Sequence, residues 1–200
     1  MARPRLTRKR LVGLDRSGPP PPETLAGAPL HPWTLPNAIG FVRLALIPVF
    51  LVLALSSGDG RDAAATALYA VIGGSDYLDG ITARITGQYS RLGTLLDPLV
   101  DRMLVISGAI VCFRFDLLPR WALIILAARE VLMLVLSRIA MRRGLEIQVN
   151  MAGRWAVWPT MFSMFLAMVS VTWVAPALLY LGLAMTLYAT LLYVRANTQA

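Results

Sequence analysis

The stretch SDYLDGITARITGQYSRLGTLLDPLVDR, residues 75–102, decides the fold because it places four aspartates in a chain that is otherwise strongly apolar. One aspartate at the centre of a membrane-spanning helix costs about 2.5–3.5 kcal/mol on an insertion scale. The four carboxylates are therefore expected to meet compensating groups. They are Asp76, Asp79, Asp97 and Asp101.

The spacing of these aspartates predicts two helix stripes that face each other. Asp76 and Asp79 are three residues apart, and Asp97 and Asp101 are four apart, so each pair shares one helix face. Small residues extend the stripes: Gly80, Ala83 and Gly87 follow the first pair, and Gly93 precedes the second. A tight turn at TGQYSR, residues 86–91, would bring the stripes together into a pocket of four carboxylates.

Several carboxylate oxygens from two helices suit hard divalent cations, and Mg²⁺ in particular accepts phosphate oxygens to complete its shell. Two such ions about 3.5–4 Å apart can activate an attacking oxygen and stabilise a leaving group on phosphorus. Two other interpretations remain open from spacing alone. One is an ion-pair network with Arg84, Arg91 and Arg102, and the other is a cation-transport path.

Composition predicts an integral membrane protein. The chain has 200 residues, of which 57% are hydrophobic and only 15% charged, against about 25% charged in typical soluble domains. Apolar runs long enough to cross a bilayer as helices, for which about 20 residues suffice, recur six times. We expect an all-α polytopic fold with spans near residues 38–56, 63–84, 94–113, 121–141, 155–171 and 175–194.

The arginines set the expected orientation. With the N-terminus inside, most of them fall on cytoplasmic segments, and the outer side receives only Arg61, Arg114 and Arg120. This asymmetry places both termini in the cytoplasm and the carboxylates in the cytoplasmic half of the cell membrane. Residues 1–31 are predicted to form a basic, proline-rich disordered tail near anionic lipid headgroups. Residues 32–200 are predicted to form the membrane domain. The net charge of +8 is therefore assigned to lipid contact, with no nucleic-acid partner.

The rarest residues exclude several chemistries. Cys112 is the one cysteine, which rules out an intrachain disulfide. His31 is the one histidine and Lys9 the one lysine. A multi-histidine metal site and a phospholipase-D-type enzyme with His-x-Lys pairs are therefore excluded.

The defined positions Asp76-x2-Asp79-Gly80-x2-Ala83-Arg84-x8-Gly93-x3-Asp97-x3-Asp101 resemble the motif of the CDP-alcohol phosphatidyltransferase family at every point. The resemblance extends from about Pro36 to the C-terminus. It implies a six-helix fold, often a homodimer, with a cytoplasm-facing site for two divalent ions, Mg²⁺ or Mn²⁺. The implied reaction is the transfer of a phosphatidyl group from CDP-diacylglycerol to an alcohol, with release of CMP.

The resemblance also implies roles for individual residues. Asp76, Asp79 and Asp97 would be the main metal ligands. Asp101 would be the general base that takes the proton of the acceptor hydroxyl, and would also touch a metal. The residues that would contact the cytidine diphosphate group are Asn37, Gly80, Ala83 and Arg84. The alternative role for Asn37 is a helix N-cap.

The acceptor alcohol is read from weaker signals. PNAIGFVRLALIPVF, residues 36–50, and SRLGTLLDPLVDR, residues 90–102, resemble phosphatidylglycerophosphate synthases and CMP-forming cardiolipin synthases. AGRWAVW, residues 152–158, lacks the lysines usual in the former, so phosphatidylglycerol is slightly favoured over glycerol 3-phosphate. The candidate acceptor-binding residues are Arg91, Arg129, Arg142 and Arg154. A phosphatidylinositol-phosphate-type synthase is the alternative enzyme, and a cation transporter is the alternative from another class.

Three charged residues within apolar runs, Arg43, Arg129 and Glu130, have no assigned partner. Arg43 is expected either to meet a substrate phosphate or to extend to the membrane interface. Arg129 and Glu130 are neighbours in sequence, which point in different directions on a helix. Each is therefore expected to find a separate partner.

Overall fold

The computed structural model describes residues 29, 31–142 and 151–198. Within these ranges the chain is all-helical, without strands. The helices are α2 (Leu35–Ser56), α3 (Ala63–Thr86), α4 (Arg91–Arg114), α5 (Arg120–Arg142), α6 (Met151–Val169) and α7 (Val174–Thr198). Their bounds fall within four residues of the six apolar runs. The predicted tail lies almost wholly outside the described residues.

Short polar side chains begin three of these helices. Thr34, Asp62 and Ser90 are the N-caps of α2, α3 and α4, and their side chains accept hydrogen bonds from backbone N–H groups of the first turn. Such caps satisfy donors that a helix leaves unpaired at its start. The prediction of Asn37 as a cap is wrong, because Asn37 supplies the backbone N–H that Thr34 Oγ1 accepts at 3.4 Å.

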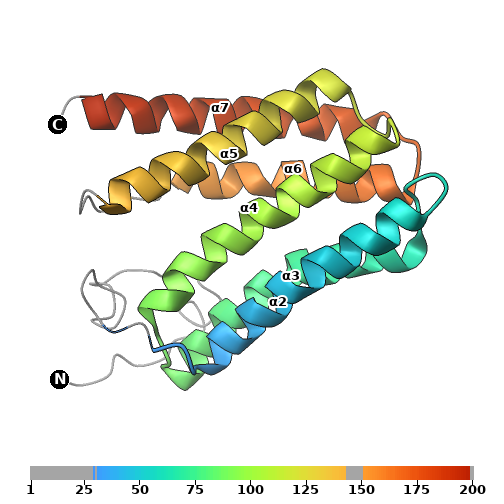
Figure 1. The fold of residues 1–200 in the computed structure, drawn as a ribbon. Coiled ribbons are helices and arrows are strands. Elements are labelled where there is room, and N and C mark those ends of the chain that lie inside the picture. The colour runs from blue at the N-terminus through green and yellow to red at the C-terminus, as the bar shows by residue number, and fades with distance from the viewer. Residues whose placement is uncertain (1–28, 30, 143–150, 199–200) are drawn as a thin grey trace.

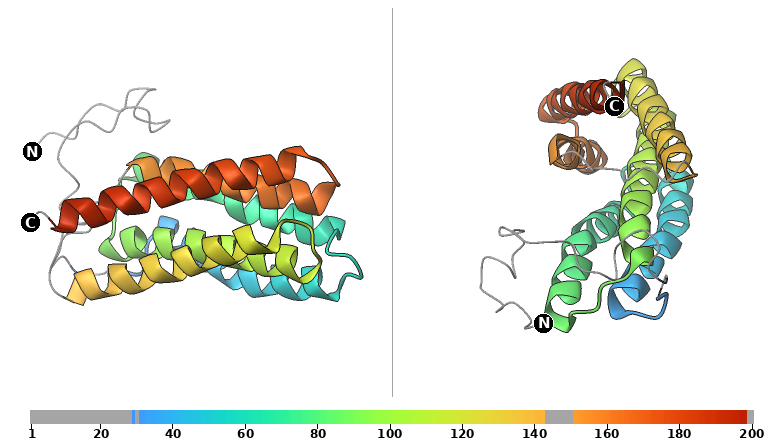
Figure 2. Two further views of the ribbon diagram at one scale, coloured as in Figure 1. Left: turned by 90° about the horizontal axis from the view of Figure 1, so that it is seen from above. Right: turned by 90° about the vertical axis from the view of Figure 1, so that its left-hand side faces the viewer.

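The helices run side by side between two ends of the bundle (Figure 1). The start of α2, the α3–α4 turn and the end of α7 lie at one end, and the short connections after α2, α4 and α6 lie at the other. Helix α2 packs on α3 and α4, α6 packs on α7, and α4 contacts both α5 and α6. Figure 2 shows α2 and α3 on one side of the end-on view and α6 and α7 on the other. Helix α4 therefore joins the two halves.

Aromatic and sulfur-containing side chains fill the core between the halves. The rings of Phe50 on α2 and Tyr69 on α3 lie 5.1 Å apart, and the Tyr69 hydroxyl reaches Met164 Sδ on α6 at 3.6 Å. Gly108 on α4 lies beneath this contact, where a Cβ atom would meet Met164 Sδ at 2.8 Å and Tyr69 at 2.9 Å. The absence of a side chain at Gly108 thus lets α3, α4 and α6 approach closely.

Two helices, Leu35–Ser56 and Val174–Leu192, are long and apolar enough to cross a membrane by length and composition, and Val157–Val169 is a shorter apolar helix. Only 28% and 33% of their most apolar windows are buried, so most of this apolar surface faces outward, as lipid contact requires. The middle helices carry the aspartates, Arg129 and Glu130, which lower their mean hydropathy. The prediction of six spans is therefore matched in helix number, while the crossing of each helix stays a prediction.

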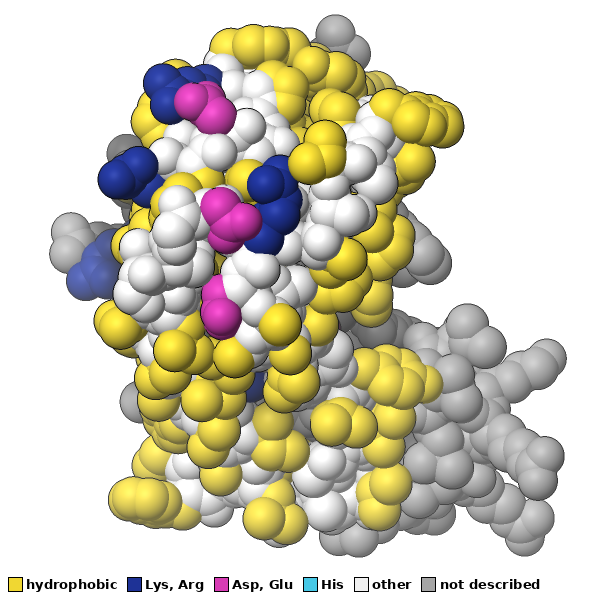
Figure 3. All heavy atoms as spheres, turned by 90° about the vertical axis from the view of Figure 1, so that its right-hand side faces the viewer, with side chains coloured by type: hydrophobic (Ala, Val, Ile, Leu, Met, Phe, Trp, Pro, Cys, Tyr) yellow, Lys and Arg dark blue, Asp and Glu magenta, His cyan; other side chains and the backbone are white. Residues whose placement is uncertain are grey.

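The end formed by the connections after α2 and α4 carries few charges. Asp59, Arg61 and Asp62 lie before α3, and Arg120 at the start of α5 pairs with Asp116 at 2.6 Å. Seen from this end, the surface shows a small group of acidic and basic side chains among hydrophobic and other neutral ones (Figure 3). Acidic and basic groups are thus mixed here, in contrast to the arginine-rich ends of the helices opposite.

Gly182 on α7 allows close packing against α6, because an added Cβ atom would lie 2.3 Å from Thr160 Oγ1 and 3.0 Å from the Thr160 backbone nitrogen. We expect Gly182→Ala to lower the free energy of unfolding by about 1–3 kcal/mol through overpacking. Gly74→Ala is the matched control, since nothing lies within 4 Å of its added Cβ. That control is expected to leave stability equal or raise it by up to about 1 kcal/mol. Thermal unfolding in detergent would compare them, and equal stability of the two variants would contradict the packing account.

Candidate active site

The α3–α4 turn brings the two predicted stripes together. Helix α3 ends at Gly87, whose φ of 65° is a left-handed conformation that favours glycine. Ser90 then begins α4 by accepting the N–H of Gly93 at 2.9 Å. Gln88 Oε1 accepts the Leu35 N–H of α2 at 3.0 Å. The turn predicted at residues 86–91 is therefore confirmed, and it is also attached to the start of α2.

Arg43 joins the two stripes from the side of α2. Its Nη1 lies 3.1 Å from Asp76 Oδ1 on α3, and its Nη2 lies 3.1 Å from Asp101 Oδ1 on α4. Its Nε donates to the carbonyl oxygen of Ile72 at 3.1 Å, one turn before Asp76. The Arg43 side chain is only 2% exposed. The expected extension to the membrane interface is thus wrong, and the residue is a buried partner of two predicted metal ligands.

The two carboxylates remain accessible from the other side. The side chains of Asp76 and Asp101 are 43% and 31% exposed. Asp97 lies one turn before Asp101 and is partly exposed. The backbones of Asp79, Gly80 and Arg84 lie on α3, but the side chains of Asp79 and Arg84 are outside those that the structure describes. The structure thus brings Asp76 and Asp101 together and leaves the place of the Asp79 carboxylate as a prediction.

The described side chains at this site include carboxylates, the ligand type that divalent cations prefer. Among the described side chains, no group of three or more acidic, histidine or cysteine residues is arranged to hold a metal ion. However, carboxylates of two helices already converge on one cation, the Arg43 guanidinium. Oxygen ligands that converge on a positive charge and remain partly exposed are what a hard cation requires. Asp76 and Asp101 thus have the ligand chemistry that a hard cation prefers, while the binding of an ion there, with Asp79 and Asp97 as additional ligands, stays a prediction.

Asn37 is fully engaged in holding the turn and the segment before α2. Its amide nitrogen donates to the carbonyl oxygens of His31 and Pro32 at 3.0 and 3.1 Å. Its amide oxygen accepts from the Ser90 hydroxyl at 2.9 Å. The residue is 1% exposed, and a Cβ atom at Gly93 would lie 2.9 Å from its oxygen. In this structure Asn37 acts as a structural tie, and its contact with the nucleotide stays a prediction.

The remaining predicted residues differ in how they are placed. Ala83 on α3 and Arg91 at the start of α4 are partly exposed, near the α3–α4 turn. Arg142 ends α5, and Arg154 lies in the first turn of α6, while both side chains lie outside the described ones. Ala83 and Arg91 therefore lie near the turn, and their contacts with substrate stay a prediction.

Arg129 belongs to a buried charge network that connects α4, α5 and α7. Glu130 accepts from Arg102 at 2.8 Å and pairs with Arg129, and Arg129 Nε donates to Thr190 Oγ1 at 3.0 Å. The predicted separate partners are confirmed as Arg102 and Thr190, but the two neighbours also pair with each other. Arg129 and Glu130 are 8% and 3% exposed, so this network is internal to the fold.

Sequence reasoning missed two parts of this site. The bridge by Arg43 and the Arg102–Glu130 pair both join residues that are far apart in the chain. The available signal was the charge itself, because an arginine or glutamate inside an apolar run has to find a partner. The sequence did not show which partner it would find.

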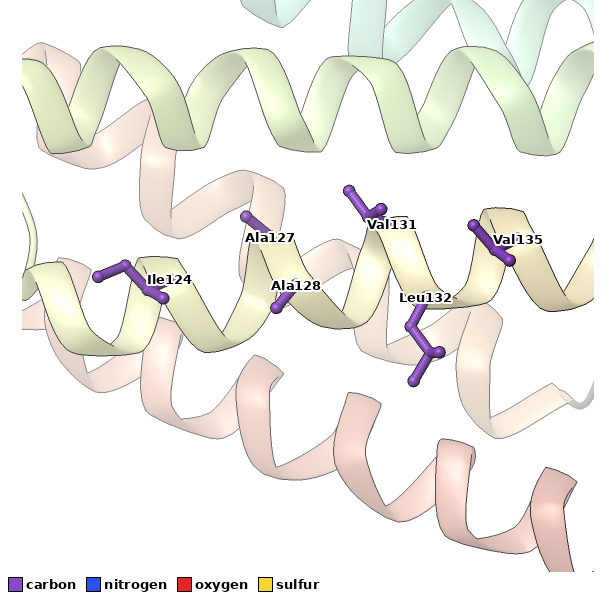
Figure 4. A pocket seen from close by; sticks show the side chains of 6 residues that line it. All are labelled: Ile124, Ala127, Ala128, Val131, Leu132 and Val135. Atoms are coloured by element: carbon purple, nitrogen blue, oxygen red, sulfur yellow. The ribbon is translucent and has the colours of Figure 1, made fainter.

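A hollow of about 650 Å³ lies along α5, lined only by aliphatic side chains. Figure 4 shows that all of them come from α5; they are Ile124, Ala127, Ala128, Val131, Leu132 and Val135. No charged or hydroxyl side chain lines it, so it offers nothing to a phosphate group and matches the chemistry of a hydrocarbon chain.

The chain is similar to known proteins along most of its length. The chain matches the CDP-alcohol phosphatidyltransferase family over residues 33–188. A cardiolipin synthase (CMP-forming) of Streptomyces coelicolor is 37% identical over 166 residues, which cover 80% of this chain and 77% of that relative. A CDP-diacylglycerol–glycerol-3-phosphate 3-phosphatidyltransferase of Bacillus subtilis is 32% identical over 138 residues, which cover 63% of this chain and 72% of that relative.

The family match includes both aspartate stripes, Arg43 and the turn between α3 and α4. The apolar helices and the enzymes to which the chain is similar indicate association with a membrane. The chain therefore belongs to the CDP-alcohol phosphatidyltransferase family and is a transferase of phosphatidyl groups in phospholipid biosynthesis.

Proposed function

We propose that this enzyme transfers the phosphatidyl group of CDP-diacylglycerol to a glycerol-type alcohol at the α3–α4 carboxylates, with two divalent ions bound there. The observation that carries this proposal is that Asp76 and Asp101, two residues of the family's motif, both pair with the Arg43 guanidinium and so lie at one site. The proposed metal ligands are Asp76, Asp79, Asp97 and Asp101.

Bound Mg²⁺ or Mn²⁺ would neutralise the diphosphate and stabilise the charge that develops on the departing CMP. The chain's own residues supply the rest. Asp101 is proposed to accept the proton of the acceptor hydroxyl. That oxygen then forms a bond to the phosphorus atom carrying the diacylglycerol group, while the bond from this phosphorus to CMP breaks. Asn37, Gly80, Ala83 and Arg84 are proposed to line the path of the cytidine diphosphate group.

The favoured acceptor is phosphatidylglycerol, which would give cardiolipin. The similarity to the cardiolipin synthase covers more of this chain than the similarity to the glycerol-3-phosphate transferase. Glycerol 3-phosphate is the second candidate, and Arg91, Arg129, Arg142 and Arg154 are the residues proposed to meet an acceptor phosphate. Family membership favours an enzyme over the cation transporter.

The proposed placement is multi-pass in the cell membrane, with the active site and both termini facing the cytoplasm. Arg91, Arg138, Arg142 and Arg154 lie toward the same end of the bundle as the α3–α4 turn. Arginine-rich segments favour the cytoplasmic side. Residues 1–31 are proposed as a cytoplasmic tail preceding a single membrane domain, residues 32–200, and a homodimer is proposed from the resemblance to the family.

Purified protein in liposomes should release CMP from CDP-diacylglycerol when Mg²⁺ or Mn²⁺ and phosphatidylglycerol are present, and EDTA should abolish the release. Parallel reactions would replace phosphatidylglycerol with glycerol 3-phosphate, inositol phosphate or serine, and the product lipids would be separated chromatographically. Preference for glycerol 3-phosphate would overturn the acceptor assignment alone. CMP release that needs inositol phosphate or serine, or that persists in EDTA, would contradict the proposed reaction.

Asp101→Asn should lower turnover by about 10²–10⁴-fold, the usual contribution of a general base, while CDP-diacylglycerol affinity stays within a few-fold. The amide oxygen of asparagine can still accept from Arg43, so the fold should persist. Asp116→Asn is the matched control, because Asp116 forms an ion pair at the other end of the bundle. Near-normal turnover of Asp101→Asn would show that another group takes the proton.

A further inference from the structure

We propose that Arg43 is a positioning residue that holds α3 and α4 in register and compensates their carboxylates before a metal ion binds. This inference rests on the proposed metal site at those carboxylates. It assigns to α2, which carries none of the four aspartates, a direct part in arranging them.

Three of the contacts that Arg43 makes have a geometry specific to a guanidinium group. Nε donates a hydrogen bond to the backbone carbonyl oxygen of Ile72 on α3, and Nη1 and Nη2 donate to Oδ1 of Asp76 and of Asp101. Each donor–acceptor distance is 3.1 Å. The planar guanidinium presents these donors in a rigid fork, whereas the ammonium group of lysine is a compact point charge. Lysine at this position would keep the positive charge, but one ammonium cannot keep all three contacts in the same geometry.

Burial indicates that Arg43 and a metal ion approach the carboxylates from different sides. The Arg43 side chain is 2% exposed and comes from the α2 core, while the Asp76 and Asp101 side chains are 43% and 31% exposed. On this proposal a metal ion enters from the exposed side of Asp76 and Asp101, and the buried guanidinium stays in place.

This arrangement has two consequences of opposite sign. Without a metal ion, Arg43 is a positive charge that offsets the repulsion between the carboxylates, so its loss should destabilise the protein. With a metal ion, the same positive charge opposes cation binding at close range. We expect the removal of this repulsion to outweigh the looser placement of the carboxylates, so that loss of Arg43 tightens metal binding. A residue with a merely structural role would weaken stability and metal binding together.

The test compares wild-type protein with Arg43→Gln and Arg43→Lys, all as full-length chains in detergent or nanodiscs. Thermal unfolding would be measured in EDTA and in Mn²⁺, Mn²⁺ affinity by electron paramagnetic resonance, and kcat and KM by CMP release. Arg120→Gln and Arg120→Lys are matched controls, because Arg120 forms an ion pair with Asp116 at the opposite end of the bundle. The controls should match wild type in Mn²⁺ affinity and kcat.

For Arg43→Gln we expect a lower melting temperature in EDTA, a larger rise on adding Mn²⁺ than wild type shows, and a several-fold tighter Mn²⁺ affinity. For Arg43→Lys we expect EDTA stability between those of wild type and Arg43→Gln. Its kcat should fall by about 10-fold or more because the carboxylates are misplaced, with KM for CDP-diacylglycerol little changed. If Arg43→Gln does not fold, Arg43→Lys alone tests the positioning role.

Wild-type kcat in Arg43→Lys would overturn the positioning role. Unchanged EDTA stability of Arg43→Gln, or Mn²⁺ affinity weaker than wild type, would overturn the compensating role. Failure of the metal site itself is distinguishable, because wild-type protein would then bind no Mn²⁺. The loss of stability of Arg43→Gln in EDTA would still support compensation by Arg43 in that case.

Discussion

Carboxylates held among apolar helices need positive charge close by, and the first half of this bundle is arranged around that requirement. Arg43 meets it by reaching from α2 to Asp76 on α3 and Asp101 on α4. Because its guanidinium is buried and the carboxylates are partly exposed, the positive charge lies behind them and their open side faces outward. Three features keep Arg43, Asp76 and Asp101 together. They are the packing of α2 on α3 and α4, the capped turn between α3 and α4, and the hydrogen bond between Asn37 and Ser90.

The next residue of α4, Arg102, also needs a partner of opposite charge. Arg102 follows Asp101 directly and pairs with Glu130 on α5, which also pairs with Arg129, itself bonded to Thr190 on α7. Two adjacent residues of α4 thus connect to opposite halves of the bundle, Asp101 toward α2 and Arg102 toward α5. A substitution in the network of Arg102, Glu130 and Arg129 is therefore expected to shift α4 and with it the position of the Asp101 carboxylate. This connection gives Arg129 a structural role, whatever it contributes to acceptor binding.

The sequence predicted the parts of the fold that local patterns determine. Apolar runs located the helices, and spacings of three and four placed the aspartates on common faces. The turn between α3 and α4 was also predicted, at residues 86–91, although Gly87 was assigned to the helix stripe and proves to be the C-cap of α3. The long-range partners could not be read in this way. Arg43 lies 33 residues from Asp76 and 58 from Asp101, and nothing in an isolated arginine within an apolar run states which carboxylates it will meet. Asn37 was read as a nucleotide contact or a cap, because its bond to Ser90 depends on how α2 packs against the turn.

The central claim is that the carboxylates of α3 and α4 form a metal centre with Arg43 behind it. Anomalous diffraction from crystals grown with Mn²⁺ and a CDP-alcohol would test it most directly. The account predicts two Mn²⁺ peaks about 3.5–4 Å apart, between the Asp76–Asp79 and Asp97–Asp101 stripes, with the Arg43 guanidinium still against the backbone of α3. Peaks located elsewhere, or a site between the stripes that stays without Mn²⁺ at saturating concentration, would contradict it.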